Sequence, residues 1–376
     1  MQNHFKEPAL WINRQADYEN MLADLSVQAH IALDTESNSL YAYQEQVCLI
    51  QISTLTTDYL VDPLADLDLN GLGEITANEG IEKIFHAAEY DVICLHRDFG
   101  FEFSRLFDTM HTARILGFEI IGLSDMLKNQ FGIEQGKSFQ KADWGKRPLK
   151  EEMKTYARYD THFLVPLRNR LSQMLADKAL IPLAEEDFSL LCQSHAEDNH
   201  RPLFAQVSGY HKLDGQALRV LDALCRWRDE TARELDRPLF KVAGANTLLE
   251  AAKNQPASLE ELHEIKGISS KVSQRHGEGM LAAIRSGLRE PPLELEKRSR
   301  PPYAYMKRLD ALRDWRKNTA LELKVQSDII LPRTIMEKIA GKASVRLDVL
   351  REEMEEVPWR FEQFGAQIMK VLEKGS

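Results

Sequence analysis

The sequence lacks any long hydrophobic run, since no stretch approaches the ~18 consecutive apolar residues that a membrane-spanning helix requires. This absence excludes a helical membrane protein. The 376 residues are 43% hydrophobic and 28% charged, close to globular averages, which excludes a disordered chain and allows two or three domains. Residues 1–18 lack the basic and then apolar pattern of a secretory signal, so we expect a cytoplasmic protein with no membrane partner.

Cysteine is also scarce. The four cysteines lie at positions 48, 94, 192 and 225, form no C-x-x-C pair and have apolar neighbours. This pattern is typical of small core side chains, and it excludes both a disulfide framework and a zinc site.

Basic residues are few in the first third of the chain. The net charge of −10 at first argues against a nucleic-acid partner, because phosphate binding needs Lys and Arg. The charge is unevenly distributed, however: residues 1–127 carry 6 basic and 21 acidic residues, whereas residues 128–170 carry 10 and 5. Two ordinary solvated surfaces would explain this, and so would a carboxylate cluster for cations beside a surface for a polyanion.

The first half of the chain has the pattern of a mixed α/β domain. Short segments rich in Ile, Val and Leu predict strands at 31–37, 47–53, 58–64 and 81–87, the first three in an antiparallel meander. Helical patterns follow at 88–99, at 122–132 and, as one long helix, from about residue 148.

The second half contains a repeat with a period of 88 residues. Residues 221–235 align without a gap on residues 309–323, and ten of the fifteen positions are identical. Residues 288–305 contain four prolines in two pairs, as an extended linker would. We therefore expect an α/β domain at 1–200 and two all-α helical-bundle modules at 208–290 and 300–376.

Three acidic patterns in the first half place carboxylates where catalysis can use them. Asp34 and Glu36 are two residues apart on a strand and so face the same side. Asp91 lies at a strand-to-helix junction, and Tyr156 and Asp160 stack on one helix face at i,i+4 spacing. Each pattern alone is weak, since Asp160 viewed alone fits a solvated helix face; the ordered combination is far more specific.

The segments DTES, HAAEYDV and YARYD, in this order, resemble the three motifs of the DEDD-type 3′ to 5′ exonucleases, in the tyrosine branch. With DWGKRPL at 143–149 and two helical modules behind it, the chain resembles the ribonuclease D family, and each module resembles the helicase and ribonuclease D C-terminal (HRDC) domain. The resemblance implies a ribonuclease H-like mixed sheet with flanking helices. The second module has Glu355 where the first has Gly267, so the turn there is expected to differ.

The resemblance also implies a catalytic site. Asp34, Glu36, Asp91 and Asp160 would hold two divalent cations, Mg²⁺ or Mn²⁺, and Tyr156 would orient the attacking water. Glu36, Tyr156 and Asp160 are thus the expected catalytic residues. Carboxylate oxygens suit these hard cations, and two metals can stabilise both the attacking and the leaving oxygen of a phosphodiester.

Candidate contacts to nucleic acid surround the basic loop at 136–148. The polar and aromatic residues that can bind or stack on RNA are Gln51, Lys137, Lys141, Trp144 and Arg147. For Trp144 a buried loop anchor is an equally good explanation. For Gln51 a polar residue on the other face of a strand is the simpler one.

These observations favour a metal-dependent 3′ to 5′ exoribonuclease that trims RNA 3′ ends and releases 5′-monophosphates. The family resemblance implies RNA with a free 3′ end as the partner, tRNA precursors among them, and the sequence indicates no obligatory protein partner. Two alternatives stay open: a 3′ to 5′ DNA exonuclease, because no residue visibly reads a 2′-hydroxyl, and a non-catalytic RNA-binding scaffold.

Overall fold

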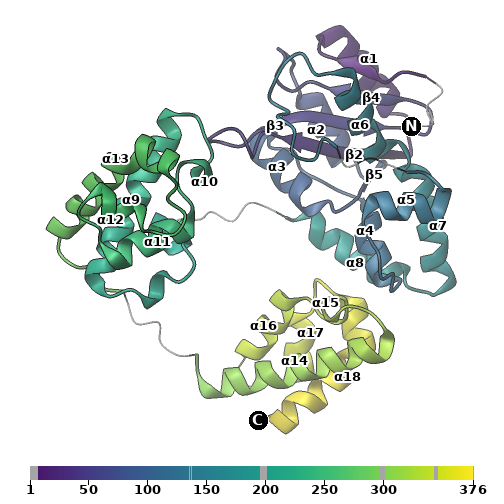
Figure 1. The fold of residues 1–376 in the computed structure, drawn as a ribbon. Coiled ribbons are helices and arrows are strands. Elements are labelled where there is room, and N and C mark those ends of the chain that lie inside the picture. Colours follow the sequence, from purple (N-terminus) through teal and green to yellow (C-terminus); the bar gives the residue numbers. More distant parts are fainter. Residues whose placement is uncertain are drawn as a thin grey trace. The chain divides into compact units, whose positions relative to one another are not determined.

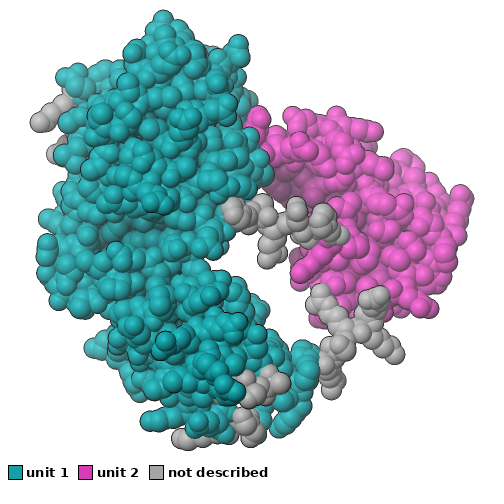
Figure 2. Space-filling model, turned by 180° about the vertical axis from the view of Figure 1, so that it is seen from behind, with its two compact units in different colours: residues 1–36, 47–196, 300–376 teal, residues 37–46, 197–299 magenta. Residues whose placement is uncertain are grey.

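The computed structural model describes residues 7–134, 136, 138–194, 201–295, 301–342 and 346–375. Contacts divide the chain into two compact units, coloured in Figure 2. The first comprises residues 1–36, 47–196 and 300–376, and the second comprises residues 37–46 and 197–299. None of the helices in the described part of the chain has the length and apolar composition needed to cross a membrane.

A six-stranded mixed sheet forms the centre of the first unit (Figure 1). Its strand order is β1-β4-β3-β2-β5-β6, and the strands span Leu10–Ile12 (β1), His30–Ser37 (β2), Val47–Ser53 (β3), Asp58–Val61 (β4), Glu82–Phe85 (β5) and Leu106–Asp108 (β6). β3 and β4 pair antiparallel, as predicted, whereas β2 with β5, β5 with β6 and β1 with β4 pair parallel. The predicted mixed α/β class is confirmed.

Helices flank this sheet on both faces. They span Gln15–Leu25 (α1), Asn70–Ala77 (α2), Glu89–Phe99 (α3), Thr109–Ile115 (α4), Leu123–Phe131 (α5), Glu151–His162 (α6), Leu164–Asp177 (α7) and Ile181–Cys192 (α8). The prediction of a single long helix from about residue 148 is wrong, because the helix is interrupted at Phe163, between α6 and α7. Pro166 explains the break: it has no N–H to donate to His162, and its ring excludes a continuous helix at that point.

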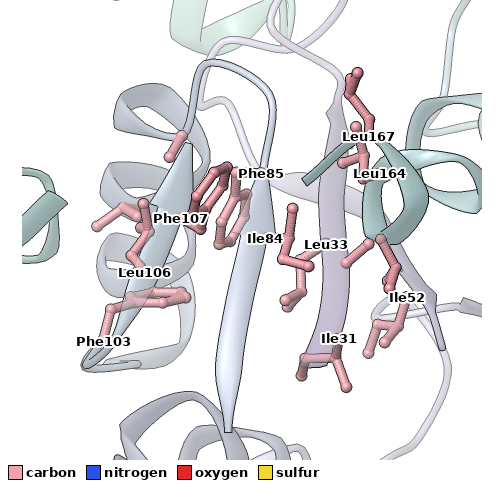
Figure 3. Packing of buried hydrophobic residues seen from close by; sticks show 14 of the residues in the cluster. Ile31, Leu33, Ile52, Ile84, Phe85, Phe103, Leu106, Phe107, Leu164 and Leu167 are labelled. Atoms are coloured by element: carbon pink, nitrogen blue, oxygen red, sulfur yellow. The ribbon is translucent and has the colours of Figure 1, made fainter. Parts of the chain in front are cut away.

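Hydrophobic side chains from both sides of the sheet make the core. Residues of β2, β5, β6 and α7 belong to one buried cluster, of which Figure 3 labels Ile31, Leu33, Ile84, Phe107 and Leu164. A separate buried cluster lies between β3, β4 and α6 and includes Leu49, Leu60, Trp144 and Ala157. The β3 strand is buried along its whole length because apolar groups cover both of its faces.

The two helical modules repeat one pattern. In the first, helices span Gly215–Glu234 (α9), Leu239–Val242 (α10), Ala245–Asn254 (α11), Leu259–His263 (α12) and Ser270–Arg289 (α13). In the second, they span Tyr303–Leu323 (α14), Ser327–Ile330 (α15), Arg333–Gly341 (α16), Leu347–Glu353 (α17) and Pro358–Gly375 (α18). Every helix of the second module begins 88 residues after its counterpart, so the period found in the sequence is a structural repeat.

The two modules differ at the turn before their last helix. Gly267 has φ +97°, and a Cβ there would lie 2.3 Å from the Thr247 Oγ1 atom, so only glycine fits this turn. Glu355 occupies the matching position of the second module and has no positive φ. The turn therefore has a different backbone in the second module, as expected from the sequence.

The second module packs onto α8 inside the first unit. The Arg360 side chain at the start of α18 is fully buried and donates to Glu186 Oε2 at 2.8 Å and to Asp187 Oδ1 at 2.6 Å. It also donates to the Ile329 carbonyl oxygen, while the Ile329 side chain joins the hydrophobic core of the α/β domain. A buried ion network and apolar packing thus join this module to α8.

Candidate active site

The Asp34 and Glu36 carboxylates lie at the carboxyl end of β2. Ile31, Ala32 and Leu33 are buried in the core, and the chain becomes half-buried from Asp34 onward. In the register of the parallel pair, Ala32 of β2 lies opposite Ile84 of β5, so both strands end at the same edge of the sheet. That edge is where α/β proteins commonly place their functional groups.

Asp91 reaches this edge through a sharp turn between β5 and α3. Ala87 has a positive φ of 71°, which is costly for a residue with a Cβ. The Asp108 carboxylate stabilises the turn by accepting from the backbone N–H groups of Ala87 at 3.2 Å and Ala88 at 2.7 Å. The turn places Asp91 in the first helical turn of α3, where Thr35 Oγ1 donates to Asp91 Oδ1 at 2.5 Å.

Tyr156 and Asp160 come from α6. With Asp34 they line a cavity of about 310 Å³, into which His86 and the start of α5 also project. A larger hollow of about 740 Å³ lies between β6, α7 and α8. Of the acids on its wall, Glu82 accepts two hydrogen bonds from Arg168, whereas Glu102 and Glu185 are exposed to solvent, so its described residues form no cluster of buried acids. The smaller cavity is therefore the candidate active site.

The acidic groups of this cavity interact strongly with one another. Burial, together with the charges of Asp160 and Asp91, raises the pKa of Glu36 to about 9, and burial raises that of Asp91 to about 7. The pKa of Asp34 is raised well above its ordinary value by burial and by Asp91, Asp160 and Glu36. Asp34 and Glu36 thus both feel the charges of Asp91 and Asp160, so the four predicted carboxylates lie close together.

The Tyr156 ring is held by two aromatic neighbours. Phe139 meets it edge-on with centroids 5.8 Å apart, and the Trp144 ring lies 6.2 Å away. Burial and the charges of Asp160 and Glu36 raise the pKa of the Tyr156 hydroxyl above its ordinary value, so this group stays protonated at neutral pH. It is therefore a hydrogen-bond donor or acceptor beside the carboxylates and not a base.

The donor chemistry of the cluster fits divalent cations. Four carboxylates that repel one another are the ligand set that Mg²⁺ and Mn²⁺ prefer, and a bound cation would replace the protons that the raised pKa values retain. Within the described residues, no three acidic, histidine or cysteine side chains already surround one cation position.

The residues predicted to contact nucleic acid differ in how exposed they are. Gln51 and Trp144 are 0% and 1% exposed, so neither side chain is accessible to RNA in this structure. The Arg147 guanidinium donates to both carboxylate oxygens of Asp62 at 2.6 and 2.8 Å and to the Trp144 carbonyl oxygen, which makes it an anchor of the basic loop. Lys141 is exposed, and Lys137 lies outside the described residues.

Several cavity residues escaped the sequence reasoning. The His86 Nδ1 atom lies 2.9 Å from Thr109 Oγ1, and the side chain also lines the cavity. Ser124, Asp125 and Gln140 line the opposite wall. His86 could have been noticed from its place in the motif HAAEYD, whereas nothing in the sequence marks the other three.

Comparison with known proteins identifies the family. A sequence model described as 3′–5′ exonuclease matches residues 10–176, and the HRDC domain matches residues 217–284 and 306–372. A ribonuclease D from Desulfotalea psychrophila is 32% identical over 271 residues, which are 70% of this chain and 72% of that protein. The chain belongs to the ribonuclease D family. The predicted family and the predicted HRDC modules are confirmed.

Other relatives of this ribonuclease D family member are longer. Protein RRP6-like 1 of Arabidopsis thaliana is 29% identical over 338 residues, or 86% of this chain and 51% of that protein. The chain spans 34% of a second such relative, RRP6-like 2. The crystal structure of Escherichia coli RNase D matches over 98% of this chain and 99% of that one, with a TM-score of 0.70 at 24% identity, which shows the common fold.

Proposed function

We propose that this member of the ribonuclease D family is a metal-dependent 3′ to 5′ exoribonuclease that releases 5′-monophosphates. The observation that carries the proposal is the cluster of Asp34, Glu36, Asp91 and Asp160, of which Asp34 and Asp160 line a cavity together with a protonated Tyr156. Buried like charges are costly unless cations bind them, so a site of this kind is retained for metal chemistry.

In the proposed mechanism the four carboxylates hold two divalent cations, Mg²⁺ or Mn²⁺. Bound cations supply a nucleophile at neutral pH and neutralise the charge that develops on the phosphate oxygens. Tyr156 stays protonated and orients the attacking water by hydrogen bonding. The Phe139 and Trp144 rings fix the direction of that hydroxyl, because they pack against the phenol ring on α6.

The cavity size suits the end of a chain. Its volume of about 310 Å³ lies at the lower end of the ~300–1,000 Å³ typical of small-molecule pockets. A site of this size accommodates one terminal nucleotide and excludes a base-paired duplex, which supports removal of one nucleotide at a time.

We propose RNA with a free 3′ end as the substrate, structured precursors such as those of tRNA among them. The Escherichia coli relative is described as an exoribonuclease involved in structured RNA processing. The two HRDC domains would hold the body of the RNA. The alternative of a DNA exonuclease rests on the same carboxylates, since none of them distinguishes a 2′-hydroxyl, and a non-catalytic scaffold is disfavoured by the complete acidic set.

Degradation assays on the full chain test this proposal. RNA and DNA oligomers of one sequence, labelled at either end, are incubated with Mg²⁺, with Mn²⁺ or with EDTA. We expect 5′-labelled RNA to shorten one nucleotide at a time with either cation and to stay intact in EDTA. Degradation that persists in EDTA would overturn the metal dependence, and DNA degraded as fast as RNA would overturn the RNA preference.

A further inference from the structure

A second buried carboxylate, Asp58, lies behind the catalytic face of α6. Asp58 begins β4 and is 3% exposed. It lies opposite Ser53 in the antiparallel pair of β3 and β4, and Ser53 Oγ donates to its Oδ1 atom at 2.7 Å. The hairpin that joins these two strands thus presents a charged group to the helix that packs over it.

Three side chains of α6 are tied to this carboxylate. Arg158 Nε donates to Asp58 Oδ2, and His162 Nδ1 lies 2.8 and 2.9 Å from the two oxygens. Ser53 connects the third, because its hydroxyl also lies 2.7 Å from Thr161 Oγ1. Hydrogen bonds between charged groups are short and directional, so this arrangement fixes both the rotation of α6 about its axis and its position along the sheet.

The tied residues bracket the catalytic one. Arg158 is two positions before Asp160, and Thr161 and His162 are the two positions after it. On a helix the neighbouring residues point to other faces, so Asp160 is turned toward the cavity when the other three are turned toward Asp58. A rotation of α6 would displace the Asp160 carboxylate and break the ties to Asp58.

We propose that Asp58 is a positioning residue that, through Arg158, His162 and the Ser53–Thr161 bridge, sets the place of Asp160 among the cation-binding carboxylates. This inference rests on the proposed function. A buried ion pair contributes little net stability compared with apolar packing, but it defines one geometry, and ligands of Mg²⁺ tolerate little displacement. Partners that orient metal ligands typically change metal affinity or activity by about 10–100-fold when they are removed.

A matched carboxylate elsewhere in the domain provides the control. Glu82 on β5 is 8% exposed and accepts from Arg168 of α7 at 2.5 and 3.0 Å, and His30 lies 3.7 Å from it. Like Asp58, it is thus paired with one arginine and one histidine. The α7 helix that it ties down carries none of the proposed catalytic residues.

The experiment compares Asp58→Asn with Glu82→Gln in the full chain. Each variant is assayed for kcat and KM on a short RNA with saturating Mn²⁺, for Mn²⁺ affinity by calorimetry, and for melting temperature. We expect Asp58→Asn to lower kcat and Mn²⁺ affinity by on the order of tenfold or more with KM for RNA little changed, as for loss of a ligand-orienting partner. We expect Glu82→Gln to lower the melting temperature but not kcat or Mn²⁺ affinity.

Equal losses of kcat in the two variants, or unchanged kcat and Mn²⁺ affinity in Asp58→Asn, would overturn the inference. If Asp58→Asn does not fold, Ser53→Ala replaces it, because this change removes the bridge to Thr161 and leaves the ion pair of Asp58. We then expect kcat and Mn²⁺ affinity to fall by about threefold each, which is a fraction of the loss expected when a whole orienting partner is removed. Ser53→Ala indistinguishable from the wild type would then overturn it. A wild-type protein with no cation-dependent activity would instead refute the proposed function.

Discussion

Two regions of the first unit bury clustered carboxylates, and they differ in the charge of the groups next to those carboxylates. At the carboxyl edge of the sheet, the charged groups that raise the pKa of Asp34 are the other acids of the cluster. At the contact between α8 and the second module, burial also raises the pKa of Glu186, but the Arg360 guanidinium opposes this shift and binds both Glu186 and Asp187.

The difference separates a functional cluster from a structural one. Acids that have an arginine partner form a closed network that holds two parts of the chain together. Acids that face each other beside a cavity destabilise the protein, and in the proposed function a bound cation relieves this cost. Asp58, which Arg158 and His162 bind, belongs to the first kind although it lies next to the second.

The largest expected effect is that of Asp34→Asn. We expect turnover of labelled RNA to fall on the order of 10³-fold, comparable to removing an electrostatic stabiliser of a transition state. The melting temperature of the cation-free protein should stay the same or rise, because a like charge leaves the cluster. RNA binding, measured by fluorescence anisotropy, should be retained. A variant that still trims RNA at the wild-type rate would show that the cluster is not the active site.

Arg360→Met tests the other side of the comparison. Removing the arginine leaves Glu186 buried without a cation and leaves Asp187 with His111 alone, so we expect a loss of about 3–5 kcal/mol in the free energy of unfolding, measured by chemical denaturation. The control is Arg333→Met in the same module, whose pair with Glu337 is exposed to solvent, so we expect this variant to lose far less stability. Equal losses in the two variants would contradict the structural role of the buried network.

Much of the architecture could be predicted because its signals are local. The strand at 47–53 begins with four consecutive apolar residues, and the 88-residue period in the sequence predicted two similar helical modules. β1 and β6 were missed because three residues are too few to show an alternating pattern. The break at Phe163 was missed because the polar and apolar spacing continues across it.

The candidate site could be predicted only in part, because many of the side chains that contact one another there are far apart in the sequence. Asp34, Asp91 and Asp160 stand in motifs that can be recognised in the sequence. The long-range partners of the buried carboxylates stand in no such motif: Arg158 is 100 residues from Asp58, and Arg360 is 173 residues from Asp187. Nor does the sequence show that Trp144 is buried, because an aromatic residue in a basic loop fits RNA stacking as well as it fits an anchor.

The smallest expected effect is a pH dependence of stability that arises from the acidic cluster. The folded-state pKa of Glu36, about 9, is raised from its ordinary value, so as pH rises the unfolded chain gives up this proton before the folded chain does. The cation-free protein should therefore lose stability between pH 6.5 and 8.5, by about 2–4 °C in melting temperature for each 1 kcal/mol lost. Mg²⁺ should remove this loss, because it favours the ionised carboxylates. Glu36→Gln, which retains every other titrating group, should show a smaller decline, and an equal decline in this variant would mean that the cluster is not its source.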